Sequence, residues 1–473
     1  MSSLLIKNAH ILTMDDRHTE IPNGGLFIRD GFIEQIGQTE SLRSEADEVL
    51  DLKGHVLLPG LVNTHHHFYQ TLTRAVPAAQ AANLFNWLKT LYPIWARINP
   101  EDIFISTSTA LAELALSGCT TASDHLYLYP NGSKLDDEIA AASEIGLRLH
   151  ASRGSMSLGE ADGGLPPDSV VDDEDSILKD SQRLIQKYHD AKPGSMVQIV
   201  LAPCSPFSVT GELMKQSAKL AREYGVHLHT HLAETEDEEQ FCLEKFGHRP
   251  VGYMQEVDWV GDDVWFAHAV WVNDEEIKVF AKHNCGVAHC PTSNMRLASG
   301  IAPIKEYRAA GVNVGLGVDG SASNDGSHLL AEVRNAMLLS RVKEGITGFS
   351  ASPSPSPSGR GGPEGSGEGE RKLMTAREAL YLGTRGGAAV LGRKDIGSLE
   401  VGKCADFFAV KLDKLGFAGM HDPVSAIVFG QPVNADYTVV GGKFIVKEGQ
   451  LVTVDEHKLI ERHNNAAKRL LLS

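Results

Sequence analysis

Two kinds of hydrophobic pattern divide the chain. Near both ends, apolar and polar positions alternate in short segments separated by turn residues, which is typical of β-strands and hairpins. These segments are residues 4–14, 24–37, 405–413 and 437–449. Within the second segment, the sequence Arg29-Asp30-Gly31 predicts a tight hairpin turn. Both ends of the chain are therefore expected to contribute strands.

The middle of the chain repeats a different unit. Short apolar runs rich in β-branched residues alternate with amphipathic segments of helical length, such as residues 100–118 and 211–225. The eight runs are 55–67, 119–125, 147–154, 196–203, 226–234, 264–270, 285–291 and 312–320. Repeated strand–helix units build a parallel sheet, and eight of them close a barrel. The pattern predicts an α/β fold, a (β/α)8 TIM-type barrel.

These patterns also predict how the chain is divided. We expect the barrel to occupy residues 57–394 and a small β-sandwich domain to combine residues 1–56 with residues 395–455, followed by a C-terminal helix over 456–473. Residues 350–372 consist mainly of Pro, Ser, Gly and Glu without apolar periodicity. Such a segment cannot bury enough surface to offset its ordering entropy, so it is expected to be a disordered insert within the barrel domain. A regulatory or docking segment is the alternative.

Composition narrows the class of protein. Of the 473 residues, 42% are hydrophobic and 22% charged, and the net charge is -17, which repels phosphate backbones and argues against nucleic acid as a partner. The six cysteines are scattered without a CxxC pair, as in proteins of reducing compartments. The N-terminus lacks a secretory h-region, and no run reaches the roughly 18 apolar residues of a membrane span. A cytoplasmic protein with no membrane partner is expected.

Ionisable residues stand at or near the ends of the eight predicted strands. They are His67, His125, Arg153, Cys204, His231, His268, His289 and Asp319. Polar residues are ordinary where loops begin, but His or Asp at six of eight strand ends exceeds that explanation. Because the carboxyl ends of the strands meet at one face of a barrel, these side chains are expected to gather there.

The three consecutive histidines suggest a metal site. Side chains alternate on a strand, so His65 and His67 share one face and His66 points to the other. Of the histidines in residues 226–234, His231 lies nearest the strand end and is the best third nitrogen, whereas those at 227 and 229 are expected to be core residues. Asp319 lies in a glycine-flanked turn that lets a carboxylate approach an ion. Imidazole and carboxylate ligands with an open position are typical of catalytic zinc.

Two further groups complete the candidate site. Glu234 lies just beyond a strand, where a carboxylate can reach a water molecule, and His268 ends another strand. Each has a structural alternative: Glu234 stands in an acidic helix start, where glutamates favour the helix dipole, and His268 alone would more often be a core histidine. Asp319 alone could be a turn former. Together with the histidines, these three residues favour a catalytic metal site over separate structural roles.

Several motifs resemble those of the metal-dependent deaminases of the amidohydrolase superfamily. They are PGLVNTHHHFYQ (59–70), HTHLAET (229–235), WFAHAV (265–270), HCPTSNMRLASG (289–300) and GLGVDGSASND (315–325). The segment IGSLEVGKCADFFAV (396–410) is similar to the family's return into its β-sandwich, and the resemblance covers essentially the whole chain except 350–372. Residues 71–98, 153–167 and 201–210 are similar to the deaminases that act on 8-oxoguanine, and less so to hydroxyatrazine-type aminohydrolases.

The resemblance implies a ligand set and catalytic roles. The implied ligands are His65, His67, His231 and Asp319, holding one Zn²⁺ per subunit, with Fe²⁺ as the alternative. Family branches with two ions carry a lysine on the fourth strand, and residues 196–203 contain none. Glu234 matches the proton-shuttling glutamate, His268 would orient the attacking oxygen, and Asp319 would also accept a proton. The subunits are expected to form homodimers or larger homo-oligomers.

The implied reaction is hydrolytic deamination of an oxidised purine, with 8-oxoguanine and water giving urate and ammonia. Isocytosine, guanine, a pterin or a hydroxytriazine are alternative heteroaromatic amine substrates, and a non-catalytic scaffold on a hydrolase fold is a remote one. Gln70 follows His67 in the first loop, and its amide can both donate to and accept from a purine edge. Trp87, Arg153 and Cys204 are further candidates to contact substrate, although Trp87 could be core and Arg153 could pair with a carboxylate.

Overall fold

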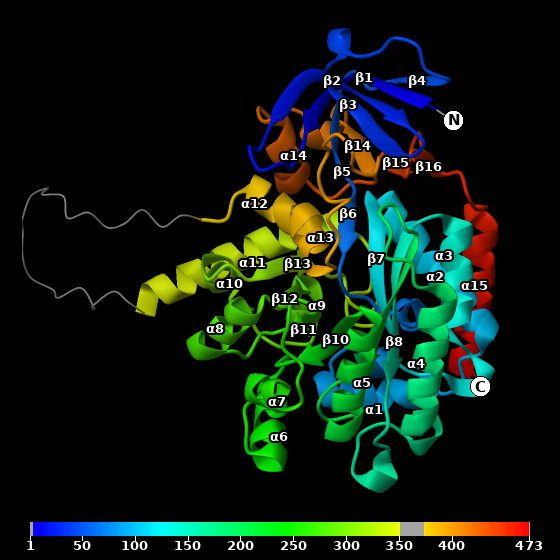
Figure 1. Cartoon of the computed structure of the whole chain (residues 1–473), viewed down its shortest axis with the longest axis vertical. Coiled ribbons are helices and arrows are strands. Elements are labelled where there is room, and N and C mark those ends of the chain that lie inside the picture. Colours follow the sequence, from blue (N-terminus) through cyan, green and yellow to red (C-terminus); the bar gives the residue numbers. More distant parts are fainter. Residues whose placement is uncertain (1–2, 351–372, 473) are drawn as a thin grey trace, which may run out of the picture.

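The computed structural model describes residues 3–350 and 373–472, and its centre is a closed parallel barrel (Figure 1). The barrel strands are β6 (Leu61–Asn63), β7 (Cys119–Leu126), β8 (Arg148–Ser155), β9 (Val197–Pro203), β10 (His227–Leu232), β11 (Val264–His268), β12 (Gly286–His289) and β13 (Asn313–Leu316). They pair in chain order, and β13 closes on β6 through Leu316 and Asn63. All eight predicted runs supply a strand, so the predicted TIM-type barrel is confirmed.

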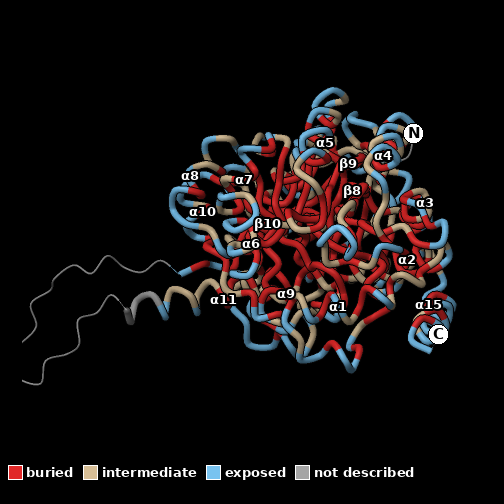
Figure 2. Tube along the Cα trace, turned by 90° about the horizontal axis from the view of Figure 1, so that it is seen from below, coloured by how far each residue is buried: buried red, intermediate tan, exposed pale blue. Residues whose placement is uncertain are grey.

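Helices surround the barrel, and the buried residues lie inside the ring that they form (Figure 2). The helices are α1 (Leu84–Trp95), α2 (Pro100–Leu116), α3 (Leu135–Ile145), α4 (Glu174–Tyr188), α5 (Gly211–Tyr224), α6 (Glu236–Phe246), α7 (Pro250–Glu256), α8 (Asp274–His283), α9 (Pro291–Arg296), α10 (Ile304–Ala309), α11 (Leu329–Ser350), α12 (Ala376–Tyr381) and α13 (Gly387–Val390). Many start at a side-chain cap, such as Asn99 before α2 and Thr210 before α5. Within 3–350 and 373–472, no helix combines the length and hydropathy needed to span a bilayer.

A second domain combines the two ends of the chain, as expected. Its strands are β1 (Ser3–Leu12), β2 (Glu20–Arg29), β3 (Phe32–Gln38), β4 (Glu48–Asp51), β5 (His55–Pro59), β14 (Phe407–Lys411), β15 (Tyr437–Val440), β16 (Lys443–Lys447) and β17 (Gln450–Leu451), hydrogen-bonded into one nine-stranded sheet. β5 joins the two ends because it pairs parallel with β1 and antiparallel with β14. The predicted turn at Asp30 and Gly31 connects β2 and β3, and both residues adopt positive φ.

The sheet domain is tied to the barrel by a buried ion pair. Arg148, at the start of β8, binds Asp406, which precedes β14, through two hydrogen bonds of 2.6 and 3.0 Å. Both side chains are almost fully buried. This bidentate contact fixes the sheet against the end of the barrel opposite the strand carboxyl termini.

Two segments complete the architecture. α14 (Pro423–Phe429) packs on α11 and α12, and α15 (Glu456–Leu472) packs along α2 and the short helix η2 (Phe68–Thr73). η2 directly follows the three histidines, so the C-terminal helix lies against the first loop of the barrel face (Figure 1). The expected insert at 350–372 falls almost wholly outside the described residues.

Candidate metal centre

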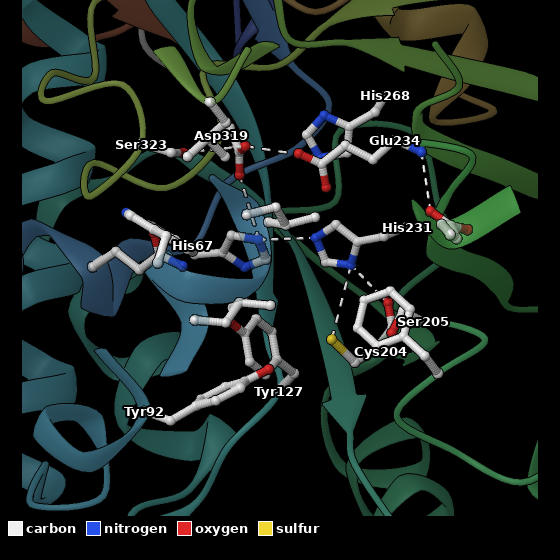
Figure 3. A pocket seen from close by; sticks show the side chains of 17 residues that line it. His67, Tyr92, Tyr127, Cys204, Ser205, His231, Glu234, His268, Asp319 and Ser323 are labelled. Atoms are coloured by element: carbon white, nitrogen blue, oxygen red, sulfur yellow. Dashed lines mark hydrogen bonds and ion pairs between the residues drawn. The ribbon is translucent and has the colours of Figure 1, made fainter. Parts of the chain in front are cut away.

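The barrel brings the predicted imidazole and carboxylate groups to one point (Figure 3). Nε2 of His67 lies 3.1 Å from Nε2 of His231 and 3.4 Å from Oδ1 of Asp319. The same Asp319 oxygen lies 3.3 Å from Nε2 of His65. These residues come from β10 and from the segments that follow β6 and β13, so strands 164 and more positions apart supply one cluster. His66 lies outside it, with its ring on Ser327 at 3.0 Å.

Hydrogen bonds fix the tautomers of His67 and His231. Nδ1 of His67 lies 2.7 Å from the carbonyl oxygen of His125, and Nδ1 of His231 lies 2.6 Å from that of Cys204. A carbonyl can only accept, so each Nδ1 carries the proton and each neutral ring turns an Nε2 lone pair toward the other. Two lone pairs 3.1 Å apart cannot hydrogen-bond to each other; a cation between them would satisfy both.

His65 is oriented by a second histidine. Nδ1 of His229 lies 3.0 Å from the carbonyl oxygen of Trp265 and must donate to it. Nε2 of His229 is then an acceptor, and it lies 2.9 Å from Nδ1 of His65. His65 therefore carries its proton on Nδ1, and its Nε2 lone pair also faces the cluster. Ligand histidines are typically held in this way by a hydrogen bond to their other nitrogen.

The cluster has the spacing of a zinc site. Bonds of about 2.0 to 2.1 Å in a tetrahedron place ligand atoms about 3.3 Å apart. Three of the distances between these ligand atoms, His67 to His231, His65 to Asp319 and His67 to Asp319, run from 3.1 to 3.4 Å. Nε2 of His65 is buried without a hydrogen-bond partner, as a ligand nitrogen would be before an ion is added. The residues present thus fit a single zinc ion.

Burial and charge favour the ligand forms of these groups. Burial lowers the pKa of His65, His67 and His231, the last to about 3, so all three rings stay neutral at pH 7. Burial alone would raise the pKa of Asp319, but the contact with His65 and the charge of His268 hold it well below its usual value. Three neutral imidazoles and one carboxylate are the forms in which these side chains bind metals.

Glu234 and His268 stand beside the cluster in different protonation environments. Nε2 of His268 lies 3.6 Å from Oε2 of Glu234 and 3.8 Å from Oδ2 of Asp319. Burial and the charge of Asp319 raise the pKa of Glu234. Burial would lower the pKa of His268, yet the two carboxylates raise it, and Asn294 accepts its Nδ1 proton at 2.9 Å. These two side chains can therefore hold protons that the ligand histidines cannot.

A cavity opens over the cluster. Much of its lining is apolar and aromatic, from Leu84, Trp87, Leu88, Tyr92, Phe207 and Leu297. Of the described residues that line it, none is lysine or arginine. A small, flat and largely uncharged ring suits such walls, with polar groups only at one side.

Three of the four candidate substrate contacts line this cavity. Gln70 is buried and its Oε1 has no hydrogen-bond partner. A Cβ at Gly320 would lie 1.9 Å from that oxygen, so the Gln70 amide can take this position only because residue 320 is glycine. Trp87 lines the wall while its indole donates to the carbonyl of Ala322 at 3.1 Å. Cys204 lies beside His231, with Sγ 3.9 Å from Nδ1.

Arg153 is not among the lining residues, which corrects its predicted placement. Its guanidinium binds Asp180 at 3.2 Å and Asp172 at 3.4 Å and stacks on Tyr129, on the helix side of β8. The physical reason is strand alternation: Ser152 shares a face with Ser123 of the neighbouring strand β7, 3.3 Å away, so the next side chain points to the opposite, outer face. Arg153 instead pairs with carboxylates, which was the structural alternative that the sequence left open.

Sequence reasoning missed several side chains of the site. The cavity is also lined by Tyr127, Ser205, Glu238 and Ser323. Tyr127 follows the second strand end by one residue, and Ser205 follows the fourth, so their positions beyond predicted strands were a usable signal. His229 was assigned to the core, and its link to His65 depends on two strands meeting, which no local pattern reveals.

Comparisons with known proteins agree with this geometry. Residues 56–445 match the model of the amidohydrolase family. An 8-oxoguanine deaminase of Pseudomonas aeruginosa is 49% identical, covering 95% of both chains, and a hydroxydechloroatrazine ethylaminohydrolase of Pseudomonas sp. (strain ADP) is 35% identical, covering 100% of this chain and 96% of that protein. The crystal structure of an atrazine chlorohydrolase from Arthrobacter aurescens TC1 complexed with zinc superposes with a TM-score of 0.89 at 31% identity, covering 98% of this chain and 100% of that chain. This chain belongs to the amidohydrolase family.

Proposed function

We propose that the protein is a zinc-dependent deaminase that hydrolyses 8-oxoguanine to urate and ammonia. The observation that carries the proposal is the convergence of His65, His67, His231 and Asp319 below a cavity with an apolar wall and two protonatable groups. The 49% identity to an 8-oxoguanine deaminase favours this substrate among heteroaromatic amines.

We infer that these four side chains hold one zinc ion per subunit, because their tautomers and spacing suit it. The chemistry that zinc supplies in such a site is a lowered pKa of water, toward about 7, which makes a nucleophile available at neutral pH. Asp319 keeps its carboxylate ionised, so its Oδ2, which accepts a hydrogen bond from Ser293 at 2.6 Å, can take up a proton from the attacking water. Iron remains the alternative ion.

The protein's own residues then move protons. Glu234, whose pKa is raised, delivers a proton from its carboxyl group to a ring nitrogen as the oxygen adds to the carbon that bears the amine. His268 donates a hydrogen bond from Nε2 toward the attacking oxygen and holds it between the two carboxylates. The bond to the exocyclic nitrogen then breaks as the added oxygen passes its remaining proton back to Glu234, and the proton that Asp319 took up completes ammonia.

The cavity binds the ring. Trp87 and its apolar neighbours contact the faces of a planar heterocycle, and these contacts add to the hydrophobic part of the binding free energy. The unpartnered Oε1 of Gln70 accepts a ring N–H or amine hydrogen, and its Nε2 donates to an oxo group. An unpaired buried amide costs about 1 to 3 kcal/mol, so a ligand that pairs with it gains affinity.

A hydroxytriazine amine is the second candidate substrate, favoured by the 35% identical ethylaminohydrolase and the superposition on a triazine enzyme. Isocytosine, guanine and pterins belong to the same chemical class. In all of them an amine is bonded to a ring carbon between nitrogens. The same four metal ligands and Glu234 would serve each reaction, so the cavity walls decide between them.

We also propose that the protein acts in the cytoplasm. All six cysteines are unpaired and buried in the structure, from Cys119 near the barrel start to Cys404 at the sheet domain. Unpaired thiols at this density are typical of a reducing compartment.

The decisive experiment measures kcat/KM of the zinc-loaded enzyme on 8-oxoguanine, guanine, isocytosine, isoxanthopterin and an N-ethylated hydroxytriazine. Ammonia is assayed for all and urate by its absorbance for the first. We expect 8-oxoguanine to exceed the others at least about tenfold, a difference of about 1.4 kcal/mol in transition-state binding. Faster turnover of the triazine would overturn the substrate proposal. Full activity of Glu234→Gln would remove Glu234 from the mechanism.

A further inference from the structure

We propose that Glu238 is a positioning residue, which fixes the Glu234 carboxylate over the cavity by binding the backbone that carries it. The inference rests on the proposed function, in which Glu234 transfers the proton. Its basis is geometric: Glu238 Oε1 accepts the backbone N–H of Ala233 at 2.8 Å, and Oε2 accepts that of Glu234 at 3.0 Å.

Both oxygens of Glu238 are committed to these two donors. The side chain lies in the first turn of α6 and is 1% exposed. Both carboxyl oxygens can accept, so they match two adjacent N–H groups that point the same way, and among the described residues no other acidic side chain bonds to these N–H groups. Glu238 lines the cavity, but its oxygens are occupied by the chain rather than directed at a ligand.

The backbone that Glu238 binds has a strained conformation. Ala233 adopts a φ of 51°, in the left-handed region that side chains with a Cβ rarely enter. Its carbonyl accepts from the N–H groups of Val270 and Trp271 at 2.9 and 2.8 Å, so the turn is tied to the loop after β11 on its other side. Glu238 supplies the matching contacts from α6, and together they hold a turn that would otherwise relax.

This turn decides where Glu234 points. β10 ends at Leu232, and the left-handed residue after it redirects the chain so that the next side chain enters the cavity (Figure 3). The Glu234 carboxylate itself is held weakly: Ser299 donates to Oε1 at 3.3 Å, and His268 lies 3.6 Å from Oε2. Because these side-chain contacts are long, the orientation of the carboxylate depends on the backbone that carries it.

Neighbouring acidic residues provide a contrast. Glu236 and Asp237 are exposed in the same turn of α6, and Glu239 pairs with Arg249. Glu236 shares the charge and helix position of Glu238 without contacting the backbone at 233 or 234. It is the matched control, because any effect of acidic charge at the N-terminus of α6 applies to both.

The first test is Glu238→Gln in the zinc-loaded enzyme, with Glu236→Gln as control. Glutamine keeps the size of the side chain but turns an N–H group toward one of the two backbone donors. We expect kcat to fall about 10- to 100-fold with KM within about twofold of the unaltered enzyme, as for a misplaced catalytic group. Zinc content should stay the same, and Glu236→Gln should keep both constants.

The second test asks whether Glu238 acts through Glu234. In the double variant Glu234→Gln/Glu238→Gln, kcat should equal that of Glu234→Gln alone. The glutamine at position 234 has no acidic proton to transfer, so misplacing it costs no further activity. A separate structural role would make the two losses multiply. Multiplied losses would overturn the inference.

The outcomes separate this inference from the proposed function. Unchanged kcat in Glu238→Gln, beside a strong loss in Glu234→Gln, would overturn the role of Glu238 and leave the proposed function intact. Unchanged kcat in Glu234→Gln would overturn the proposed proton transfer itself. If Glu238→Gln is insoluble, Glu238→Asp keeps two acceptors on a shorter stem; an intermediate kcat supports the inference and an unchanged kcat opposes it.

Discussion

Nε2 of His463 lies 3.0 Å from the hydroxyl oxygen of Thr71, although 392 positions separate the two residues in the chain. Burial lowers the pKa of His463 to about 4, so the ring is neutral at pH 7. Thr71 lies in η2, next to Gln70, and its hydroxyl donates to the carbonyl of Ser106 at 3.4 Å. The C-terminal helix therefore holds the loop that carries a proposed substrate contact.

Replacing this histidine should weaken substrate binding more than catalysis. In His463→Ala we expect KM for 8-oxoguanine to rise about fivefold, the equivalent of about 1 kcal/mol, while kcat changes less than about twofold. The reason is that η2 loses a buried anchor while the metal ligands keep theirs. Steady-state kinetics measures this, with the exposed His457→Ala on the same helix as control. An unchanged KM would show that α15 does not hold η2.

Removing the acceptor behind His65 should loosen the metal. In His229→Leu, Nδ1 of His65 loses its partner at 2.9 Å, and the ring is no longer fixed in the tautomer that presents Nε2. We expect the affinity for zinc to fall about 10- to 100-fold, measured by competition with a chromophoric chelator. His227→Leu, two residues earlier on the strand, is the control. Equal affinities in both variants would contradict the role of His229.

A buried carboxyl pair should make stability depend on pH. Asp124 in β7 and Glu138 in α3 are each 1% exposed, and Asp124 Oδ1 accepts the N–H of Phe68, next to His67, at 2.6 Å. Burial raises the pKa of Asp124 to about 8, and burial together with the charge of Asp124 raises the pKa of Glu138 well above its usual value. The folded protein thus binds protons that the unfolded chain has released.

Stability should consequently fall as pH rises from about 5 toward 8, by about 1.4 kcal/mol per pH unit for each proton retained only in the folded state. The double variant Asp124→Asn/Glu138→Gln has no ionisable group at this pair and should lack that part of the slope. Urea unfolding of both proteins between pH 5 and 8.5 gives the difference. Parallel curves would mean that the pair does not share a proton.

Breaking the ion pair between the domains should destabilise the protein without changing its chemistry. Asp406→Asn leaves the guanidinium of Arg148 buried without its counter-charge, at a cost of about 3 to 5 kcal/mol. Glu48→Gln, which breaks the exposed pair with Lys447, should cost less than about 1 kcal/mol. Urea unfolding at pH 7 compares them, and kcat of the folded variants should match the unaltered enzyme. Equal stabilities would show that this pair does not join the domains energetically.

The sequence by itself determined the barrel and the face on which its chemistry lies. Hydrophobic periodicity is a local property, so eight apolar runs predicted eight strands. Alternation along an extended chain separated His65 and His67 from His66, and the structure shows the same division although the three residues lie just beyond β6. The strand ends followed from the parallel order, because every strand of a closed barrel ends at one face.

Only the tertiary structure decided which atoms meet. A position near a strand end did not place Arg153 in the cavity, since the alternation of β8 turns its side chain outward to Asp180. The sequence did not distinguish Glu238 from the acidic residues around it, because its contact depends on how α6 packs against the turn at Ala233. The physical reason is that a hydrogen bond requires two groups within about 3 Å. Local patterns fix the direction of each side chain on its own element, whereas that separation depends on how the elements pack.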